Sequence, residues 1–446
     1  MVVTAADPAG RRAADEVEQV IGAALSDFTA SGHRGVVVDS PPGAGKSTLV
    51  VRAATQIARG DEPVMVIAQT NEQVDDLVDR MAREAPAVRI GRLSAQGYVP
   101  TGRVAHPNVI VADRVSDLQD SPITIGTAAK WVHVTDGPWP WAIVDEAYQM
   151  RSDMLLRVAT RFERALFVGD PGQLDPFSTV EVDRWTGLTW DPMQSAVAAM
   201  LRNNPALPVH QLPLSWRLSA SAAPPVSEAF YPFTGFRAAT TAAQRRLTFQ
   251  TRGFGGPVDD TLEMAARTGW ALHELPARHT LRTDTQAVHA ITDLALRVIQ
   301  RGAVAQSERD PHEVPVTASR IAIGAAHRDQ AAAIRRALHE RGGGAIKVDT
   351  ANRLQGSEYD LVLVLHPLSG RRDATAFHLE SGRLCVLTSR HRHACIVVAR
   401  AGIQDLLDAH PPAEPMHLGV PAKFPDGWEA NQAMLAHLRA HRVPAA

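Results

Sequence analysis

The chain has 446 residues, of which 45% are hydrophobic and 21% charged, a balance that is typical of a folded globular protein and excludes disorder or collagen-like repetition. Its 46 basic and 48 acidic side chains give a formal net charge of -2, so any nucleic-acid partner must be argued from local sites. No apolar run approaches the roughly 18 residues of a membrane span and the N-terminus lacks the pattern of a secretory signal, which predicts a cytoplasmic protein with no membrane partner.

Short β-branched runs alternate with helix-like segments along the chain, which predicts an α/β fold with parallel sheets flanked by helices. The strands expected in the first half are residues 35–39, 63–68, 108–112, 122–126, 141–146 and 165–170. Those expected in the second half are residues 271–275, 319–324, 345–349, 360–366 and 394–399.

A proline-containing segment, residues 203–216, separates the two halves and predicts the end of one sheet and the start of another. We therefore expect two domains, residues 1–204 and 205–446. A short insertion is expected at about residues 86–120 in the first domain. A second insertion, polar and weakly periodic, is expected at about residues 235–270.

The sequence SPPGAGKST at residues 40–48 follows a predicted strand and precedes a predicted helix. Gly43 and Gly45 allow the backbone to wrap around phosphates, and Lys46 reaches the outer phosphates. Ser47 is the candidate magnesium ligand, and Thr48 completes the motif. A glycine-rich turn that happens to contain a lysine is the competing interpretation, which the strand–loop–helix context disfavours. Ser40 occupies the place of the first glycine of the motif, where a small residue is tolerable.

The predicted strand WAIVDE ends in Asp145 and Glu146. An acidic residue at a strand tip is placed to bind magnesium, and its neighbour can orient and deprotonate an attacking water, so Asp145 and Glu146 are assigned these two roles. Alone, the pair would be interpreted more readily as an acidic helix start. Together with the phosphate-binding loop, it predicts a nucleoside-triphosphate site.

The motifs GAGKST, DEAYQ, VGDPGQL, SWR, LQGSEYD and TSRHRHACIVV follow one another along the chain. In this order they resemble superfamily 1 helicases, nearest to the group of the nonsense-mediated-decay RNA helicase and its senataxin-like relatives, from about residue 19 to residue 399. The resemblance implies two tandem RecA-like P-loop NTPase domains with ATP and Mg²⁺ as cofactors. It further implies a monomeric, nucleic-acid-dependent ATPase that translocates on single-stranded DNA or RNA and is a helicase.

The resemblance also assigns roles to single residues of the first half. Gln173 matches the glutamine that senses the γ-phosphate, and Asp170 matches the acid of the same motif. Gln19 lies upstream of the phosphate-binding loop, where the family has a glutamine that reads adenine, although a solvent-facing helix residue is an equal alternative.

In the second half, Arg217 matches an arginine that contacts the γ-phosphate, and Trp216 replaces a tyrosine that stacks on adenine. Gly356 and Glu358 match residues near the γ-phosphate and the ribose. The arginine finger aligns with Arg390, but TSRHRH departs from the family pattern, so Arg392 stays open as the finger.

Polar residues that follow predicted strands are candidates for contacts with the nucleic-acid backbone through hydroxyl, amide and amine donors. They are Thr70, Asn71, Thr127, Lys130, Thr350 and Asn352. Thr70 could instead be an ordinary helix N-cap, and both roles are compatible. His327 and Arg328, which open a helix after the strand at 319–324, are a weaker candidate pair, since a solvated helix start explains them equally well.

Cysteine and histidine give little evidence for a metal site. Cys385 and Cys395 cannot form a four-thiolate site and are expected in the core. The RHRH run at residues 390–393 lacks nearby carboxylates or thiols that would favour a metal site. Three alternatives to the helicase remain: a translocase or remodeller without unwinding activity, a P-loop regulatory NTPase that does not act on nucleic acid, and a non-enzymatic module descended from a helicase.

Overall fold

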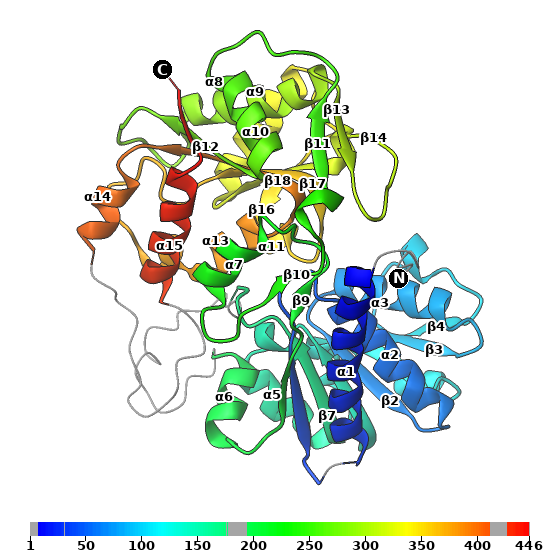
Figure 1. Ribbon diagram of the computed structural model, residues 1–446. Coiled ribbons are helices and arrows are strands. Elements are labelled where there is room, and N and C mark those ends of the chain that lie inside the picture. The colour runs from blue at the N-terminus through cyan, green and yellow to red at the C-terminus, as the bar shows by residue number, and fades with distance from the viewer. Residues whose placement is uncertain (1–7, 31, 175, 177–193, 411–425, 446) are drawn as a thin grey trace. The chain divides into compact units, whose positions relative to one another are not determined.

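The computed structural model describes residues 8–30, 32–174, 176, 194–410 and 426–445. The chain divides into two compact units. The N-terminal unit comprises Ala14–Pro171 and Asp175–Leu212. The C-terminal unit comprises Pro213–Ala446 together with Met1–Ala13 and Gly172–Leu174. Each unit is built around one large parallel sheet (Figure 1).

The sheet of the N-terminal unit has eight strands, and each pair of neighbours is parallel. From one edge to the other, the strands are β4 (Val109–Ala112), β3 (Ile90–Leu93), β5 (Ile123–Thr127), β2 (Val64–Ala68), β6 (Trp139–Asp145), β7 (Phe162–Gly169), β1 (Gly35–Asp39) and β8 (Val209–Gln211). The strand that carries the phosphate-binding loop, β1, is thus separated from β6 by β7.

Helices connect these strands and pack against the sheet. They are α1 (Pro8–Ala30), which belongs to this unit from Ala14 onwards, α2 (Lys46–Arg59), α3 (Asn71–Glu84), α4 (Ala128–Trp131), α5 (Ser152–Val158) and α6 (Ala196–Asn203). Short 3-10 turns are η1 (Gly102–Val104), η2 (Val115–Leu118), η3 (Ala147–Gln149) and η4 (Ala159–Arg161).

The C-terminal unit has a six-stranded parallel sheet. Its order is β16 (Lys347–Thr350), β15 (Ile321–Ala325), β17 (Tyr359–Leu365), β18 (His391–Arg400), β12 (Trp270–Leu275) and β19 (Arg442–Pro444). A small antiparallel sheet adds β11 (Arg246–Phe249), β13 (Ala303–Gln306) and β14 (Val314–Pro315), and a two-stranded parallel ribbon adds β9 (Leu214–Ser215) and β10 (Arg237–Ala238).

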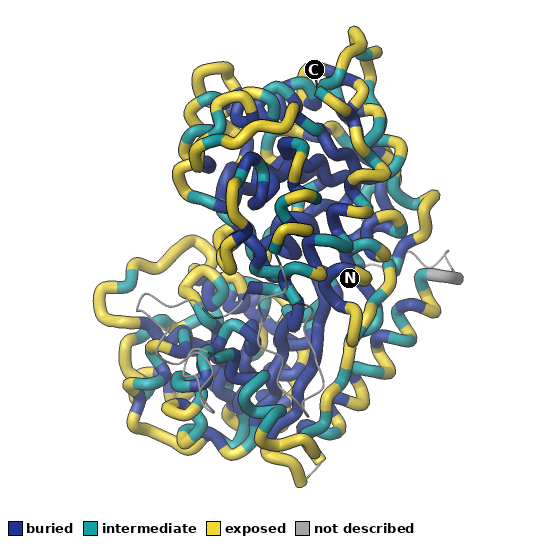
Figure 2. Tube along the Cα trace, turned by 90° about the vertical axis from the view of Figure 1, so that its left-hand side faces the viewer, coloured by how far each residue is buried: buried dark blue, intermediate teal, exposed yellow. Residues whose placement is uncertain are grey.

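The helices of this unit are α7 (Ala223–Phe230), α8 (Pro257–Thr268), α9 (Thr285–Gln300), α10 (Arg328–Glu340), α11 (Ala351–Leu354), α12 (Ala376–Leu379), α13 (Ser381–Thr388), α14 (Ile403–Asp408) and α15 (Gly427–Arg439), with 3-10 turns η6 (Ala242–Gln244) and η7 (Ala318–Arg320). Alternate residues of β17 point to opposite faces of the sheet. Leu361 and Leu363 pack with α8, α9 and α10, whereas Val362 and Val364 pack with α7, α13 and α15. Both faces are therefore covered, as the near-continuous apolar sequence of a parallel strand predicts. Figure 2 shows this burial along the inner strands.

The α/β fold class predicted from the sequence is confirmed, because each predicted strand corresponds to a strand of one of the two large sheets. Strand β3, with the sequence IGRL, was not expected, since glycine and arginine interrupt its apolar pattern. Strand β8 lies in the proline-containing segment, where it forms the edge of the sheet.

The structure modifies the predicted domain boundaries. Residues 205–212 belong to the N-terminal unit, because β8 pairs with β1, so the units divide at Leu212 and Pro213 rather than at residue 204. The predicted insertion at 86–120 contains β3 and β4, which extend the sheet. The predicted insertion at 235–270 contains α8, whose Leu262 and Ala265 are part of the hydrophobic core, so this segment contributes to the folded unit.

Within the described residues, no helix combines the length and the apolar character that crossing a membrane requires.

Candidate functional site

The loop between β1 and α2 has a backbone that depends on glycine. Gly43 and Gly45 have φ angles of 74° and 99°, in the left-handed region that residues with a Cβ rarely adopt. Helix α2 begins at Lys46, and no described side chain caps its N-terminus. The first N–H groups of a helix are unsatisfied and lie at the positive end of its dipole, so this loop is suited to binding an anion.

Contacts between three strand ends shape the surroundings of this loop. The amide of Ser40 donates to the carbonyl of Gly169 at 2.8 Å, which joins the ends of β1 and β7. The Tyr148 hydroxyl, just after β6, donates to Asp39 Oδ1 at 2.5 Å. A Cβ on Gly169 would lie 2.9 Å from the Tyr148 ring, so this position requires glycine. The residues that follow β6 are thereby held close to the end of β1, although β7 separates the two strands.

Lys46 and Glu146 form an ion pair in this region, and both side chains are largely buried. Burial lowers the pKa of Lys46, but the carboxylates of Glu146, Asp145 and Asp170 outweigh that effect and leave it above its usual value. The lysine is therefore charged at neutral pH. The structure brings together the lysine of the loop and the two acids of DEAYQ, as the sequence analysis expects.

Asp145 provides an open acceptor at the end of β6. The residue is 4% exposed, and its Oδ1 atom has no hydrogen-bond partner in the described part of the chain. Burial raises the pKa of Asp145 to about 6, with Lys46 acting in the opposite direction. A buried carboxylate oxygen without a partner is costly unless a cation or donor completes it. Mg²⁺, which proteins often hold through one or two carboxylates plus phosphate oxygens, fits this position, with the half-buried Ser47 as the second candidate ligand.

Glu146 also has an unusual backbone. Its φ angle of 50° lies in the left-handed region, which a residue with a side chain adopts at a cost of about 1 kcal/mol or more. Its Oε2 accepts a hydrogen bond from Gln149 Nε2 at 3.3 Å. The side chain is therefore held by Lys46 and Gln149 together, and the backbone turn directs it to that position immediately after β6.

Two other predicted nucleotide-site residues of the N-terminal unit have different surroundings. The hydroxyl of Thr48 accepts a hydrogen bond from Arg80 Nη2 at 2.6 Å, which ties α2 to α3. Gln19 is exposed on α1, and its neighbour Glu18 pairs with Arg52 of α2 at 2.5 Å. No described contact joins Gln19 to the phosphate-binding loop, so its role in reading adenine stays a prediction.

The C-terminal unit contains a cluster of charged side chains that we call the arginine cluster. Its members are Arg217, Arg245, Arg309, Arg392, Glu308 and Glu358. Glu358 is contacted by Arg309 at 2.7 Å, by Arg217 at 3.4 Å and by Arg392 at 3.5 Å. Glu308 is contacted by Arg245 at 2.8 Å and by Arg392 at 3.2 Å. Predicted residues from three separate motifs, SWR, LQGSEYD and TSRHRH, therefore meet in one place.

Positive charge exceeds negative charge in the arginine cluster, since four guanidinium groups face two carboxylates. Burial raises the pKa values of Glu308 and Glu358, but the arginines outweigh it and both values are lowered. The pKa of Arg392 is lowered by burial and by repulsion from Arg245 and Arg309. An anion placed beside Arg392 would relieve that repulsion, which makes the cluster a candidate site for a phosphate.

The two candidates for the arginine finger have different environments. Arg392 is a member of the arginine cluster together with Arg217. Arg390 is 1% exposed, and its Nε donates to the carbonyl of Val386 at 3.2 Å. Its Nη2 has no hydrogen-bond partner among the described residues. Arg390 precedes β18, whose first residue is His391, whereas Arg392 lies within the strand.

The remaining predicted nucleotide-site residues of this unit lie around the same motifs. Trp216 is half-buried, and its carbonyl accepts from Arg245 at 2.7 Å. Gly356, with a φ angle of 83°, allows the turn between α11 and Glu358. Gln173, in the short segment that belongs to the C-terminal unit, accepts a hydrogen bond from Gln355 Nε2 at 2.5 Å. The glutamine of VGDPGQL thus contacts the motif LQGSEYD directly.

The candidate nucleic-acid residues of the N-terminal unit follow two paired strands, β2 and β5. Thr70 caps α3 in a capping box with Gln73, which confirms the N-cap alternative. Asn71 accepts from Arg92 Nη2 at 2.9 Å. Thr127 caps α4, and Lys130 Nζ donates to the carbonyl of Asp113 at 2.8 Å. These side chains therefore already have structural roles. If they also bind a nucleic-acid backbone, those contacts would add to the hydrogen bonds described here or replace them.

The corresponding residues of the C-terminal unit follow the paired strands β15 and β16. Thr350 is the N-cap residue of α11, but its side chain accepts no capping hydrogen bond in the described structure. Asn352 is exposed in the same helix. His327 Nε2 lies 3.1 Å from His378 Nε2, and the exposed Arg328 begins α10.

Several residues of the site were missed by the sequence analysis. Arg245, Glu308 and Arg309 complete the arginine cluster, and Tyr148 and Asp39 join the ends of β6 and β1. Tyr148 could have been suspected from its place within DEAYQ. No local pattern marks Arg245, Glu308 or Arg309, because they come from β-hairpin and loop positions that only the fold brings together.

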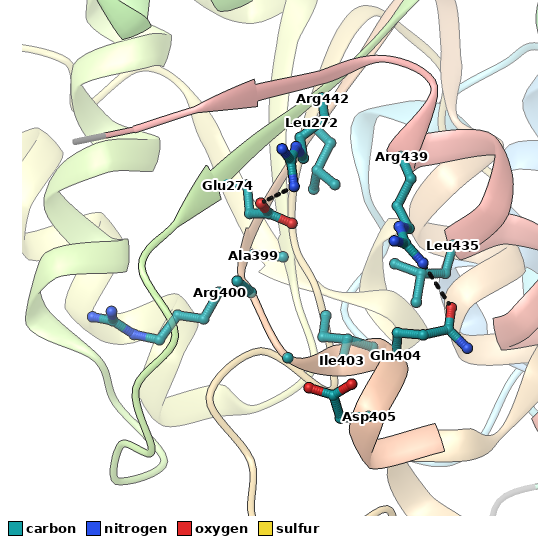
Figure 3. A pocket seen from close by; sticks show the side chains of 12 residues that line it. Leu272, Glu274, Ala399, Arg400, Ile403, Gln404, Asp405, Leu435, Arg439 and Arg442 are labelled. Atoms are coloured by element: carbon teal, nitrogen blue, oxygen red, sulfur yellow. Dashed lines mark hydrogen bonds and ion pairs between the residues drawn. The ribbon is translucent and has the colours of Figure 1, made fainter. Parts of the chain in front are cut away.

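No group of three or more histidine, cysteine, aspartate or glutamate side chains suited to a metal ion occurs in residues 8–30, 32–174, 176, 194–410 and 426–445. Cys385 and Cys395 are fully buried, in α13 and β18. A pocket of about 170 Å³ lies at the ends of β12 and β18 (Figure 3). There Arg442 pairs with Glu274 at 3.1 Å, and Arg439 donates to Gln404 at 3.3 Å. The pocket contains none of the predicted site residues.

Family comparisons agree with this architecture. Residues 17–185 match the family model of an AAA domain, and residues 203–402 match the model of another AAA domain. Two successive parts of the chain are thus each similar to an AAA domain, in agreement with an α/β fold built on two large parallel sheets. The two matches support the resemblance to superfamily 1 helicases, while the nonsense-mediated-decay and senataxin-like branch stays a prediction. No curated protein matches the sequence.

Solved structures with similarity to the chain include viral helicases. The helicase of PRRSV is 13% identical with a TM-score of 0.43, and the match covers 87% of this chain and 56% of that one. Arterivirus nonstructural protein 10 (helicase) in complex with DNA is 12% identical with a TM-score of 0.43, covering 88% of this chain and 65% of that one. The chain thus spans 56% and 65% of the length of these structures, so activity, substrates and partners are matters for proposal.

Proposed function

We propose that the protein is a nucleic-acid-dependent ATPase that translocates on single-stranded DNA or RNA, a helicase of superfamily 1. The observation that carries the proposal is the arrangement at the ends of β1 and β6. There the lysine of a phosphate-binding loop pairs with Glu146, beside a buried Asp145 that has an open carboxylate oxygen. A lysine, a potential metal ligand and a potential base in one place are what phosphoryl transfer from a nucleotide requires.

In this proposal each side chain of the N-terminal site has a separate task. Bound ATP with Mg²⁺ would supply the phosphoryl group and the metal charge. Lys46 moves its ammonium group from Glu146 to the outer phosphates, which frees the Glu146 carboxylate. Glu146 then orients a water and accepts its proton, and Asp145 and Ser47 are the residues that would hold Mg²⁺.

The arginine cluster is proposed to stabilise the negative charge that builds up on the γ-phosphate oxygens during hydrolysis. Arg217 and Arg392 are the residues assigned to it, with Arg392 preferred over Arg390 as the finger. The preference is supported by the contact of Arg392 with Glu358 and by the surplus of positive charge around it. Glu358 and Glu308 would hold the guanidinium groups in place until phosphate replaces one of their contacts.

Coupling to nucleic acid rests on the resemblance and on Gln173. This residue is hydrogen-bonded to Gln355 of the LQGSEYD motif, which supports a link between the nucleotide-sensing motifs and the strand that ends at Thr350. Thr70, Thr127 and Thr350, at the carboxyl ends of parallel strands, are proposed to contact the backbone of a single strand. Whether a duplex is unwound as well depends on elements beyond this motor.

The test is a steady-state ATPase assay against a panel of single-stranded DNA, single-stranded RNA and tailed duplexes, with and without Mg²⁺. We expect Mg²⁺-dependent turnover that rises several-fold with at least one single-stranded polymer. Turnover that no polynucleotide changes would reject the motor and favour a regulatory NTPase. A polymer that stimulates turnover without loss of tailed duplex would identify a translocase that does not unwind.

A further inference from the structure

A loop of the C-terminal unit exposes an aromatic ring to solvent. Phe254, in the sequence TRGFGG between β11 and α8, is 93% exposed, the highest value among the exposed large apolar residues of the described chain. Its neighbours Gly255 and Gly256 have φ angles of 85° and 88°. The loop lies in the segment that the sequence analysis treated as an insertion of unknown role. An isolated exposed apolar residue is common, so the surroundings of the ring decide whether it matters.

The base of the loop is fixed by a buried ion network. The amide of Phe254 donates to Asp259 Oδ2 at 2.7 Å, and the same carboxylate receives Arg297 Nε and Nη2 at 2.9 and 3.0 Å. Arg301 lies 3.6 Å from Asp259 and also donates to the carbonyl of Thr251. A Cβ at Gly253 would lie 2.7 Å from Asp259 Cγ, so the chain can pass the carboxylate only with glycine there. The ring is therefore presented from a well-anchored backbone.

The ring is also backed by a cation. The guanidinium carbon of Arg297 lies 4.7 Å from the centroid of the Phe254 ring. Because Arg297 is fixed by Asp259, it covers one side of the ring and contributes a cation–π contact, while the 93% exposure leaves the rest of the ring accessible. Arg252, two residues earlier in the loop, is exposed as well. An accessible ring with a cation nearby can accept a planar aromatic partner on its open face and an anion beside it.

We infer that Phe254 is a base-stacking site for single-stranded nucleic acid, with Arg252 contacting the adjoining phosphate. Stacking of a base on an aromatic side chain beside arginine is a general, sequence-tolerant way to hold a single strand. A protein partner is less well matched, since a single ring surrounded by glycines offers no apolar groove for a side chain. This inference rests on the proposed function and gives the segment at 235–270 a place in it, as an additional contact outside the strand-end residues.

The experiment measures the affinity of the full-length protein for a fluorescent single-stranded oligonucleotide and for an abasic strand of the same length. We expect Phe254→Ala to weaken binding to the normal strand by between about 5- and 150-fold, the range for loss of one stacked base, and to leave binding to the abasic strand unchanged. Phe254→Trp should keep the affinity, and its indole fluorescence should be quenched when the normal strand binds.

Phe233→Ala provides a matched control, because Phe233 is another exposed ring of the same unit, at 52% exposure. Basal ATP turnover without polynucleotide should be the same in all these variants. Equal binding of the normal strand by native protein and Phe254→Ala would overturn the inference while leaving the ATPase motor intact. So would a Phe254→Ala variant whose only change is loss of self-association or of binding to another protein. A native protein that binds neither strand would reject the proposed function itself.

Discussion

Two charged clusters, one in each unit, are unbalanced in opposite directions. In the N-terminal unit, Lys46 faces the carboxylates of Asp145, Glu146 and Asp170, and burial raises the pKa of Asp145. In the C-terminal unit, four guanidinium groups face Glu308 and Glu358, and burial together with like charges lowers the pKa of Arg392. The first cluster therefore favours an added cation and the second an added anion.

The difference shows that neither cluster is explained by stability alone. A buried ion network that served only the fold would be expected to balance its charges, because uncompensated buried charge is costly. Surplus charge is useful where a ligand of the opposite sign completes the site. Mg²⁺ carries the positive charge that the N-terminal cluster lacks, and a triphosphate carries the negative charge that the arginine cluster lacks. The comparison therefore favours nucleotide chemistry over two independent structural networks.

The largest effect is expected from removing the lysine or the proposed base of the N-terminal cluster, which tests whether this cluster takes part in ATP hydrolysis. We expect Lys46→Ala and Glu146→Gln to lower the ATP turnover number by at least about 100-fold, since general-base catalysis alone contributes that much. Glu146→Gln is the more informative change, because glutamine keeps the size and an acceptor oxygen for Lys46. A steady-state phosphate-release assay measures the effect, with a thermal melt to verify folding. Turnover that survives Glu146→Gln would remove Glu146 from the chemistry.

The arginine cluster can be tested through its two neighbouring candidates. We expect Arg392→Ala to lower the turnover number by about 1000-fold, the lower end of the effect of an arginine finger, with little change in ATP affinity. Arg390→Ala should instead lower the melting temperature, because Arg390 is buried against the backbone of α13. Single-turnover hydrolysis with protein in excess separates these effects. The reverse result, with Arg390 essential for turnover and Arg392 dispensable, would assign the finger to Arg390.

Much of this arrangement could be predicted from the sequence. The parts that could not be predicted have a common physical cause. Each strand of strongly β-branched composition was found, and Lys46, Asp145 and Glu146 were assigned to one site, because short motifs at strand ends encode them locally. Strand β3 was missed because the buried Arg92, paired with Asp75 at 3.0 Å, hides its apolar pattern. Arg245 and Glu308 were missed because their contact depends on residues far apart in the chain.

The C-terminal unit should also respond to acid in a specific way. His366 is fully buried after β17, its Nδ1 accepts from the amide of Leu368 at 3.1 Å, and burial lowers its pKa to about 4. Unfolding restores a pKa near 6.5, so between these values the unfolded chain binds a proton that the folded chain does not. The contribution of His366 to stability is therefore complete above pH 6.5 and falls as the pH drops toward 4, by about 3 kcal/mol in total.

Urea unfolding at pH 7.5 and at pH 4.5 checks this prediction. His366→Asn, which keeps an acceptor for the amide of Leu368, should reduce the loss of unfolding free energy between the two pH values. His339→Asn, a change at an exposed histidine of α10, is the matched control and should leave the loss unchanged. An identical pH dependence in His366→Asn and the native protein would show that this histidine is not responsible.

The smallest expected effect distinguishes the threonines at the strand ends of the two units. Thr70 caps α3 through its side chain, whereas Thr350 makes no side-chain cap in α11. Thr70→Ala should therefore lower the free energy of unfolding by about 1 kcal/mol, while Thr350→Ala should have a much smaller effect. If both hydroxyls also contact the strand backbone, both variants should lose affinity for single-stranded nucleic acid, and Thr70→Ser should restore both properties. Loss of stability at Thr70 with unchanged strand affinity in both variants would leave the capping role as the whole function of Thr70. It would also show that the nucleic acid is not bound through the threonines at these strand ends, because removing a hydroxyl that is hydrogen-bonded to a phosphate weakens the complex.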